Sequence, residues 1–205
     1  MSDIKHRSLR KLIASRLPEI AAHAEDMTGI SLDSQPEYFM SLKIAEAIHD
    51  HFKNYTFSVE APLGDICRET GIDPSQAEKH FRVSGQGKAD IAVRHSRRGK
   101  YRHIIECKRR VMNTNALLQD ARRLAWLCTN VSCGHRMEKN FLVAITTISK
   151  KKLEERVDAI STMLHDEFDC ISLKASYCDM DYLFSTRFPD KSLRGVVCEI
   201  YFDYK

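Results

Sequence analysis

The stretch Gly87–Lys108, GKADIAVRHSRRGKYRHIIECK, decides how the rest of the chain is interpreted. It contains two apolar runs, Ala89–Val93 and His103–Cys107, joined by a short, basic turn that contains a glycine. Two runs of this kind, separated by a turn of this composition, predict a β-hairpin.

Charged residues stand at defined places in this hairpin. Asp90 opens the first run, and Glu106 and Lys108 close the second. Because alternate residues of a strand point to the same side, Glu106 and Lys108 share a face. Two carboxylates and an ammonium are therefore expected together on one face of a sheet.

The hairpin is also strongly basic. Only one acid, Glu106, stands among its cations, which are Arg94, Arg97, Arg98, Lys100, Arg102, Lys108, Arg109 and Arg110. A local patch of this kind suits a phosphate backbone, although a solvated turn accounts equally well for a run of charge taken alone. Of these cations, the expected nucleic-acid contacts are Arg94, Arg97, Arg98, Lys100, Arg109 and Arg110.

Length and composition indicate the number of domains and the kind of protein. A chain of 205 residues predicts one domain, and 43% hydrophobic residues provide a substantial core. We expect an N-terminal helical arm over residues 1–30 and a single α/β domain over 31–205. Seven cysteines without a secretion signal indicate reduced thiols and a cytoplasmic protein, and no apolar run reaches the length of a membrane span.

Hydrophobic periodicity predicts a mixed α/β order. Helices are expected over 4–27, 36–53, 116–128 and 150–168, with a loop and a short helical insert between Pro62 and Phe81. Strands are expected over 56–60, 89–93, 102–108, 141–148, 171–176 and 196–202. This order indicates a mixed central sheet flanked by helices.

The hairpin acids suggest metal-dependent chemistry. Hydrolysis of a phosphodiester needs an activated water and neutralisation of the charge that builds on the phosphate, and a divalent cation supplies both. Magnesium prefers carboxylate oxygens and keeps several waters. Asp90 and Glu106 would provide the carboxylates and the carbonyl of Cys107 a third ligand. The ammonium of Lys108 would orient the water, or help to deprotonate it if burial and the metal lower its pKa.

Asp90, fifteen intervening residues and then Glu106-Cys107-Lys108 at the end of an apolar strand resemble the PD-(D/E)xK nuclease superfamily, over roughly residues 36–148. The resemblance implies a restriction-endonuclease-like αβββαβ core, here followed by a C-terminal αββ extension. It also implies Mg²⁺, with Mn²⁺ as a substitute. Ala89 stands where the family name has proline.

The resemblance implies two further site residues. A glutamate on the first helix of the core joins the metal site, and the sequence offers Glu37 near the helix start, with Glu46 as its rival. Gln119 matches a glutamine seen after the lysine in several branches of the superfamily.

The acid-x-lysine tripeptide alone is weak, because a chain of this composition contains it by chance about once or twice. Asp3-Ile4-Lys5 has no strand around it. Pro189-Asp190 followed by Asp203-Tyr204-Lys205 fits the literal pattern, but no helix and strand can follow it. A zinc site at Cys128, Cys133 and His135 lacks a second pair of ligands at suitable spacing.

The sequence thus predicts a magnesium-dependent endonuclease acting on DNA, with RNA left open, in phage defence, restriction or repair. The alternative is a catalytically inactive nuclease-fold protein that binds nucleic acid or a protein partner. Cutting a duplex needs two sites acting together, so we expect a homodimer or a subunit of a larger complex.

Overall fold

The computed structural model describes residues 8–81, 87–97, 99–110, 113–131, 137 and 139–203. Its helices are α1 (Leu9–Thr28), the short 3-10 helix η1 (Leu32–Ser34), α2 (Glu37–His51), α3 (Leu63–Thr70), α4 (Pro74–Phe81), α5 (Thr114–Asn130) and α6 (Lys150–Glu167). Its strands are β1 (Tyr55–Pro62), β2 (Lys88–His95), β3 (Tyr101–Arg109), β4 (Lys139–Thr146), β5 (Ile171–Phe184) and β6 (Ser192–Phe202).

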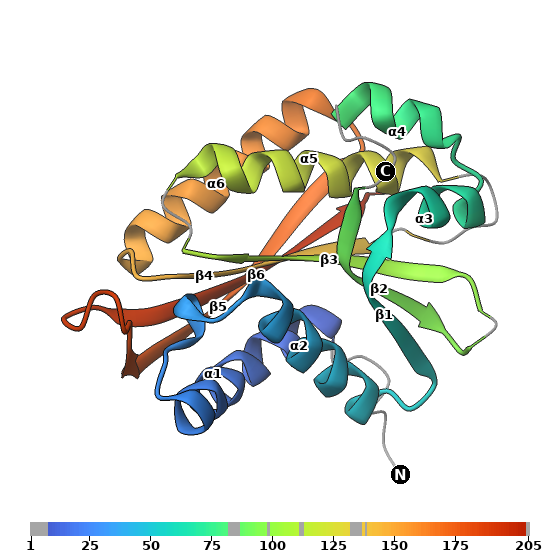
Figure 1. Ribbon diagram of the computed structural model, residues 1–205. Coiled ribbons are helices and arrows are strands. Elements are labelled where there is room, and N and C mark those ends of the chain that lie inside the picture. The colour runs from blue at the N-terminus through green and yellow to red at the C-terminus, as the bar shows by residue number, and fades with distance from the viewer. Residues whose placement is uncertain are drawn as a thin grey trace, which may run out of the picture.

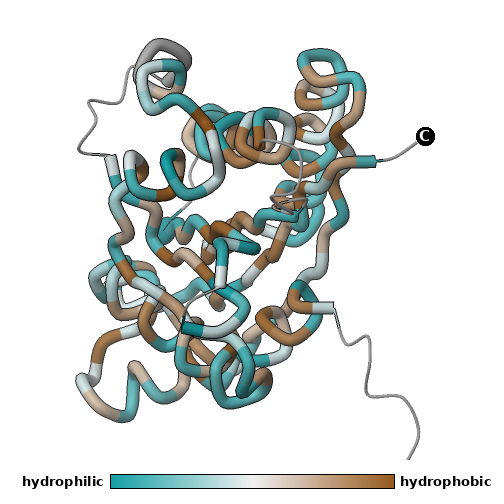
Figure 2. The backbone as a smooth tube through the Cα atoms, turned by 90° about the vertical axis from the view of Figure 1, so that its right-hand side faces the viewer, coloured by the Kyte–Doolittle hydropathy of each residue, from teal (hydrophilic) through white to brown (hydrophobic). Residues whose placement is uncertain are grey.

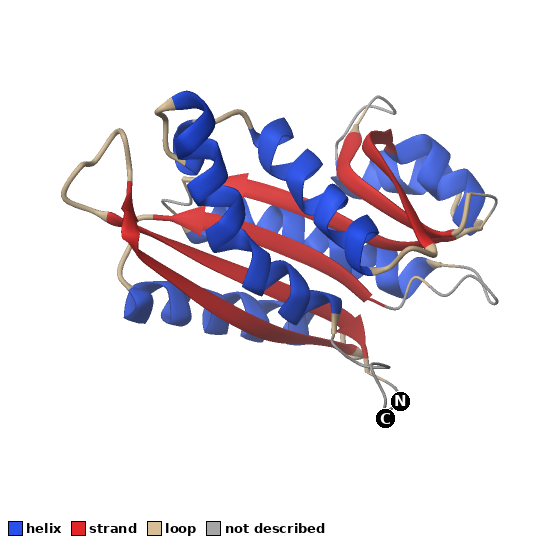
Figure 3. Cartoon of the chain, turned by 90° about the horizontal axis from the view of Figure 1, so that it is seen from below, coloured by secondary structure: helices blue, strands red, loops and turns tan. Residues whose placement is uncertain are grey.

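The strands form one six-stranded sheet in the order β1-β2-β3-β4-β6-β5. The pair β3–β4 is parallel, and α5 makes the crossover between them, while the other neighbouring strands are antiparallel. Helices α1 and α2 cover one face, and α5 and α6 cover the other (Figures 1 and 3). The expected mixed α/β sheet flanked by helices is confirmed.

Two hydrophobic layers hold the sheet between its helices. One lies under α5 and α6 and includes Ile104 and Leu142; the other lies under α1 and α2 and includes Ile105 and Val143. Neighbouring residues of β3 thus enter opposite layers, as strand geometry requires. Hydrophobic and hydrophilic residues intermix along the helices, as expected when only one side of each is buried (Figure 2).

The helix expected as an N-terminal arm is part of the core. Its apolar side, which includes Leu17 and Ile20, is buried against the sheet and α2. A Cβ at Gly195 of β6 would lie 3.0 Å from Leu17 Cδ1 and 2.6 Å from Cys178 Sγ, so glycine permits this close packing. Gly29 ends α1 in the left-handed conformation, with φ +67°.

Two elements differ from the sequence-based expectation. Helix α3 occupies part of the segment expected as a loop, and it buries Leu63, Ile66, Cys67 and Thr70 at helical spacing. Strand β5 continues eight residues beyond the expected end at 176, because its second half pairs with β6 at the sheet edge and is only partly buried. No helix in the described part of the chain is long and apolar enough to cross a membrane.

Asn140 joins α5 to the sheet inside the core. Its fully buried amide accepts a hydrogen bond from the N–H of Ile104 at 2.8 Å and donates to the carbonyl of Leu124 at 3.0 Å. Replacing Asn140 by leucine leaves both backbone groups without these partners, so we expect a loss of about 2–4 kcal/mol in the free energy of unfolding. Urea denaturation measures it; a change below 0.5 kcal/mol would show that the amide is dispensable.

Candidate active site

The site lies where β2 begins and β3 ends. The Asp90 carboxylate accepts a hydrogen bond from the N–H of Cys107 at 2.6 Å, which ties the acid of the first strand to the end of the second. Glu106 and Lys108 point toward α5, because both contact side chains of that helix. The Cys107 side chain enters the opposite hydrophobic layer, under α1 and α2.

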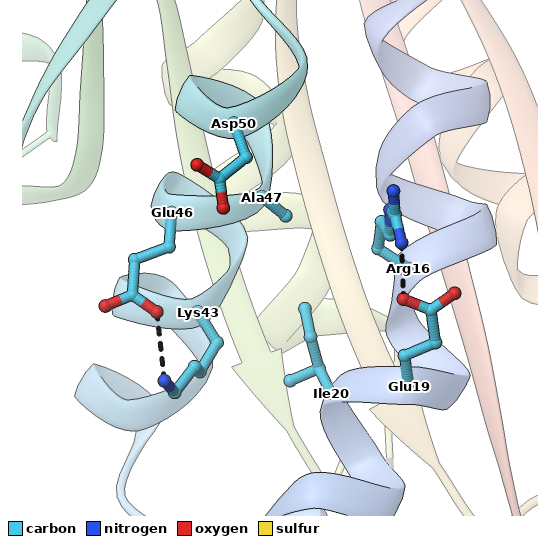
Figure 4. A pocket seen from close by; sticks show the side chains of 7 residues that line it. All are labelled: Arg16, Glu19, Ile20, Lys43, Glu46, Ala47 and Asp50. Carbon is cyan, nitrogen blue, oxygen red and sulfur yellow. Dashed lines mark hydrogen bonds and ion pairs between the residues drawn. The ribbon is translucent and has the colours of Figure 1, made fainter.

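The first turn of α2 brings Glu37 to the same place. Its carboxylate accepts a hydrogen bond from the N–H of Arg109 at 3.3 Å and lies 3.9 Å from the Lys108 ammonium. Glu46 is elsewhere on the helix: it pairs with Lys43 and lines a surface groove of about 230 Å³ between α1 and α2 (Figure 4). The geometry therefore places Glu37, and not Glu46, beside the hairpin acids.

Helix α5 contributes two residues that the sequence interpretation missed. The Asp120 carboxylate lies 3.4 Å from the Lys108 ammonium, and Arg123 bridges Asp120 at 3.0 Å and Glu106 at 2.8 Å. Gln119, the residue expected from the resemblance, is exposed. The three-residue spacing of Asp120 and Arg123 on a helix was the available signal, because it puts both side chains on one face.

Burial governs the protonation of the two hairpin acids. Loss of water raises the pKa of Glu106 to about 8; Arg123 opposes the rise, while Asp90 and Asp120 add to it. Burial also raises the pKa of Asp90, against the lowering effect of its hydrogen bond from Cys107. A cation placed between these acids would favour their ionised forms.

Lys108 behaves differently from one sequence-based expectation. Burial lowers its pKa, but the surrounding carboxylates, with Asp120 and Glu37 foremost, outweigh that effect and raise the pKa above its ordinary value. The side chain is therefore a firmly protonated ammonium. In this arrangement it can orient a water or stabilise negative charge, but it is not suited to accept a proton.

The residues fit a magnesium ion in charge and ligand type. Four carboxylates, those of Asp90, Glu106, Glu37 and Asp120, surround the ammonium of Lys108. Across the described part of the chain, no three acidic, histidine or cysteine side chains stand close enough to hold a metal by themselves. Magnesium does not require three, because it retains waters and accepts a backbone carbonyl.

The basic turn of the hairpin lies away from these acids. Between Tyr101 and Lys108, β3 extends seven residues, or about 23 Å, so Arg97 and Lys100 stand near the opposite end of the strand. Arg94 forms an ion pair with Glu69 and covers the ring of Tyr101. Arg98 lies outside the described residues.

Two of the expected nucleic-acid contacts have structural partners close to the site. Arg109 donates hydrogen bonds to the carbonyls of Ser34 and Gln35, and Arg110 donates to the carbonyl of Asp33. These bonds fix the segment that leads into α2 and so help to position Glu37.

The two acids of the competing pattern that starts at Pro189 stand far apart. Asp190 precedes β6 and Asp203 follows it, so the length of an eleven-residue strand, about 36 Å, separates them. Cys133 and His135 lie outside the described residues, and Cys128 is buried.

Comparison with known proteins provides no relative on which an assignment of function could rest. No protein-family model matches the chain, and neither the curated proteins nor the solved structures give a significant match.

Proposed function

We propose that the protein is a magnesium-dependent nuclease of the PD-(D/E)xK type, acting on DNA. The observation that carries the proposal is the meeting of Asp90, Glu106 and Glu37 with a protonated Lys108 where β3 ends. The order α2, β1, β2, β3, α5, β4 supports the same assignment. Helices α3 and α4, inserted between β1 and β2, depart from that simple order.

Asp90, Glu106 and the carbonyl of Cys107 would hold the metal. Magnesium, when bound, supplies charge neutralisation at the phosphate and a water of lowered pKa. In the hydrolysis, the water oxygen forms a bond to phosphorus and releases a proton to solvent, while the bond from phosphorus to the leaving oxygen breaks and that oxygen takes up a proton from solvent. The Lys108 ammonium orients the water and stabilises the negative charge that develops on the phosphate.

The carboxylates around Lys108 have a positioning role. Asp120 and Glu37 lie on α5 and α2, on opposite sides of the sheet, and hold the ammonium between them at 3.4 and 3.9 Å. The two helices thus fix one cation at the end of the strand, and a preorganised charge of this kind is the main means by which such sites lower a barrier.

One contact favours a second candidate function, a nuclease fold that binds nucleic acid or a protein partner without cutting. Arg123 lies 2.8 Å from Glu106 Oε1, and only 3% of the Glu106 side chain is exposed. An arginine in this place supplies the positive charge beside Glu106 that a metal would otherwise supply. The inactive alternative therefore predicts binding with no hydrolysis at any metal concentration.

Incubation with supercoiled plasmid separates the two functions. We expect nicked or linear product in Mg²⁺ or Mn²⁺, none in EDTA, and loss of at least 99% of the rate in Asp90→Asn. The matched control is Asp50→Asn, which changes an exposed acid at the groove between α1 and α2. Equal cleavage by wild type and Asp90→Asn would contradict the proposed site.

A further inference from the structure

The tip of the β5–β6 hairpin, residues 182–191, is joined to the segment before α2 by buried hydrogen bonds. Asp33 is 1% exposed, and its carboxylate accepts hydrogen bonds from Ser31 Oγ at 2.5 Å and from Ser185 Oγ at 2.7 Å. Thr186 donates its N–H to Ser31 Oγ at 2.7 Å, and its hydroxyl accepts the N–H of Ser31 at 2.7 Å. Because buried polar groups need their partners, these bonds fix the tip in place.

The same segment is fastened to the candidate active site. Arg110 donates to the carbonyl of Asp33 at 2.7 Å and to Ser34 Oγ at 3.2 Å, and it stands only two residues beyond Lys108. Glu37, the first residue of α2, follows η1 after only Gln35 and Pro36. The hairpin tip projects beyond the start of α2, at the left of Figure 1, so it flanks the site rather than the basic turn.

The tip presents aromatic rings to solvent. Tyr182 is 65% exposed and Phe184 is 48% exposed, whereas Leu183 between them is buried. The pairing of β5 with β6 is irregular between Met180 and Phe184, but exposed and buried residues alternate there, and both rings face solvent. Single exposed apolar residues are ordinary, but two neighbouring rings on a rigid hairpin form a surface for contact with a partner.

The charge of the tip suits an anionic partner. Arg187 and Lys191 are both exposed and lie over the ring of Phe188, at 5.5 and 5.0 Å from its centroid. Within residues 182–191 the one acid is Asp190, and the exposed Asp181 just before them pairs with Arg194 at 3.4 Å. Arg109 and Arg110, at the end of β3, bind the segment before α2 to which the tip is joined, so cations stand both at the end of β3 and at the tip.

We propose that the hairpin tip binds a single-stranded segment of the nucleic-acid substrate beside the cleavage site. Tyr182 and Phe184 stack on unpaired bases, and Arg187 and Lys191 contact phosphates. Exposed aromatic rings beside cations are the combination that recognises single strands, because every base offers a ring face and every nucleotide a negative charge. The inference rests on the proposed nuclease function and adds to it a preference for substrates with an unpaired flank.

Fluorescence anisotropy with a labelled twenty-nucleotide oligo(dT), in EDTA so that no strand is cut, measures this contact. We expect Tyr182→Ala/Phe184→Ala to bind 10- to 100-fold more weakly than wild type. Arg187→Ala/Lys191→Ala should reduce the slope of log affinity against log salt by about 1.4, since each phosphate contact contributes about 0.7. Met163→Ala, which removes an exposed apolar side chain on α6, should leave binding unchanged.

Three results would overturn the inference: no binding of the oligonucleotide by wild type, unchanged affinity in both double variants, or conversion of a dimer to monomers by Tyr182→Ala/Phe184→Ala with unchanged affinity. The last would assign the tip to a contact between two copies, as sedimentation velocity would reveal.

If the variants lose binding but wild type fails to cut in Mg²⁺, the nuclease function fails and the surface stands. If wild type cuts and the variants bind normally, the surface fails and the nuclease stands.

Discussion

Replacing Lys108 by methionine should reduce the rate of metal-dependent cleavage by about 10³-fold, because it removes the ammonium that orients the water and stabilises charge on the phosphate. Methionine keeps most of the length of the side chain, so the fold should persist. The loss should appear in single-turnover rates at saturating Mg²⁺, with the affinity for uncut DNA in EDTA changed less than tenfold.

The control for this variant is Lys43→Met. Lys43 lies on α2 and pairs with Glu46 in the groove between α1 and α2. Within the described residues, it forms no ion pair with the four carboxylates around Lys108. Its replacement should leave the cleavage rate within twofold of wild type. A similar loss in both variants would point to general electrostatic attraction of DNA, and an unchanged rate in Lys108→Met would remove the lysine from the mechanism.

Replacing Glu106 by glutamine should make the metal-free protein more stable at pH 8 and change it little at pH 4.5. The folded protein holds a proton on Glu106 up to a pKa of about 8, whereas the unfolded chain releases it near 4.5. Stability therefore falls as the pH rises through this window, and it falls no further above it. Glutamine does not titrate, and its amide oxygen can keep the 2.8 Å contact that Glu106 makes with Arg123.

Thermal unfolding in EDTA between pH 4.5 and 8.5 measures the effect as a difference between the two proteins. The difference in melting temperature between Glu106→Gln and wild type should widen with pH to roughly 5 °C or more, because each pKa unit corresponds to about 1.4 kcal/mol. The difference is needed because His103 acts oppositely: burial lowers its pKa to about 4, so it adds stability as the pH rises from there to 6.5. A gap that is constant with pH would show that Glu106 is ionised throughout.

Magnesium should offset this loss of stability at high pH in wild type but not in Glu106→Gln. A divalent cation at Asp90 and Glu106 binds the ionised carboxylates, so it should raise the melting temperature of wild type at pH 8 but not that of Glu106→Gln. Glu46→Gln serves as the control for loss of an exposed carboxylate and should respond to magnesium as wild type does.

The hairpin and its acids could be predicted because their placement depends on local rules. Strand alternation puts Glu106 and Lys108 on one face, and pairing across the hairpin brings Asp90 to the same end. The choice of Glu37 over Glu46 could not be made from the sequence. Both lie on α2, and only the packing of its first turn against the end of β3 separates them.

The spacing of Asp120 and Arg123 could place both on one face of α5, but the sequence could not show which face points to the site, because that depends on how the helix is rotated. Gln119 and Asp120 are neighbours, yet successive residues of a helix point about 100° apart, and the packing of α5 turns Asp120 toward Lys108. The sequence also suggested that the basic turn lies close to the acids, which it does not. Arg97 is close to Lys108 in sequence, but the intervening strand carries it to the far end of the hairpin.

The most direct test of the metal site is an anomalous difference map from crystals soaked in Mn²⁺. We expect a peak between the carboxylates of Asp90 and Glu106, about 2.1–2.3 Å from an oxygen of each, and near the carbonyl of Cys107. Arg123 should then have moved from Glu106. A map with no peak at the end of β3, and with Arg123 still bound to Glu106 at saturating Mn²⁺, would contradict the nuclease assignment.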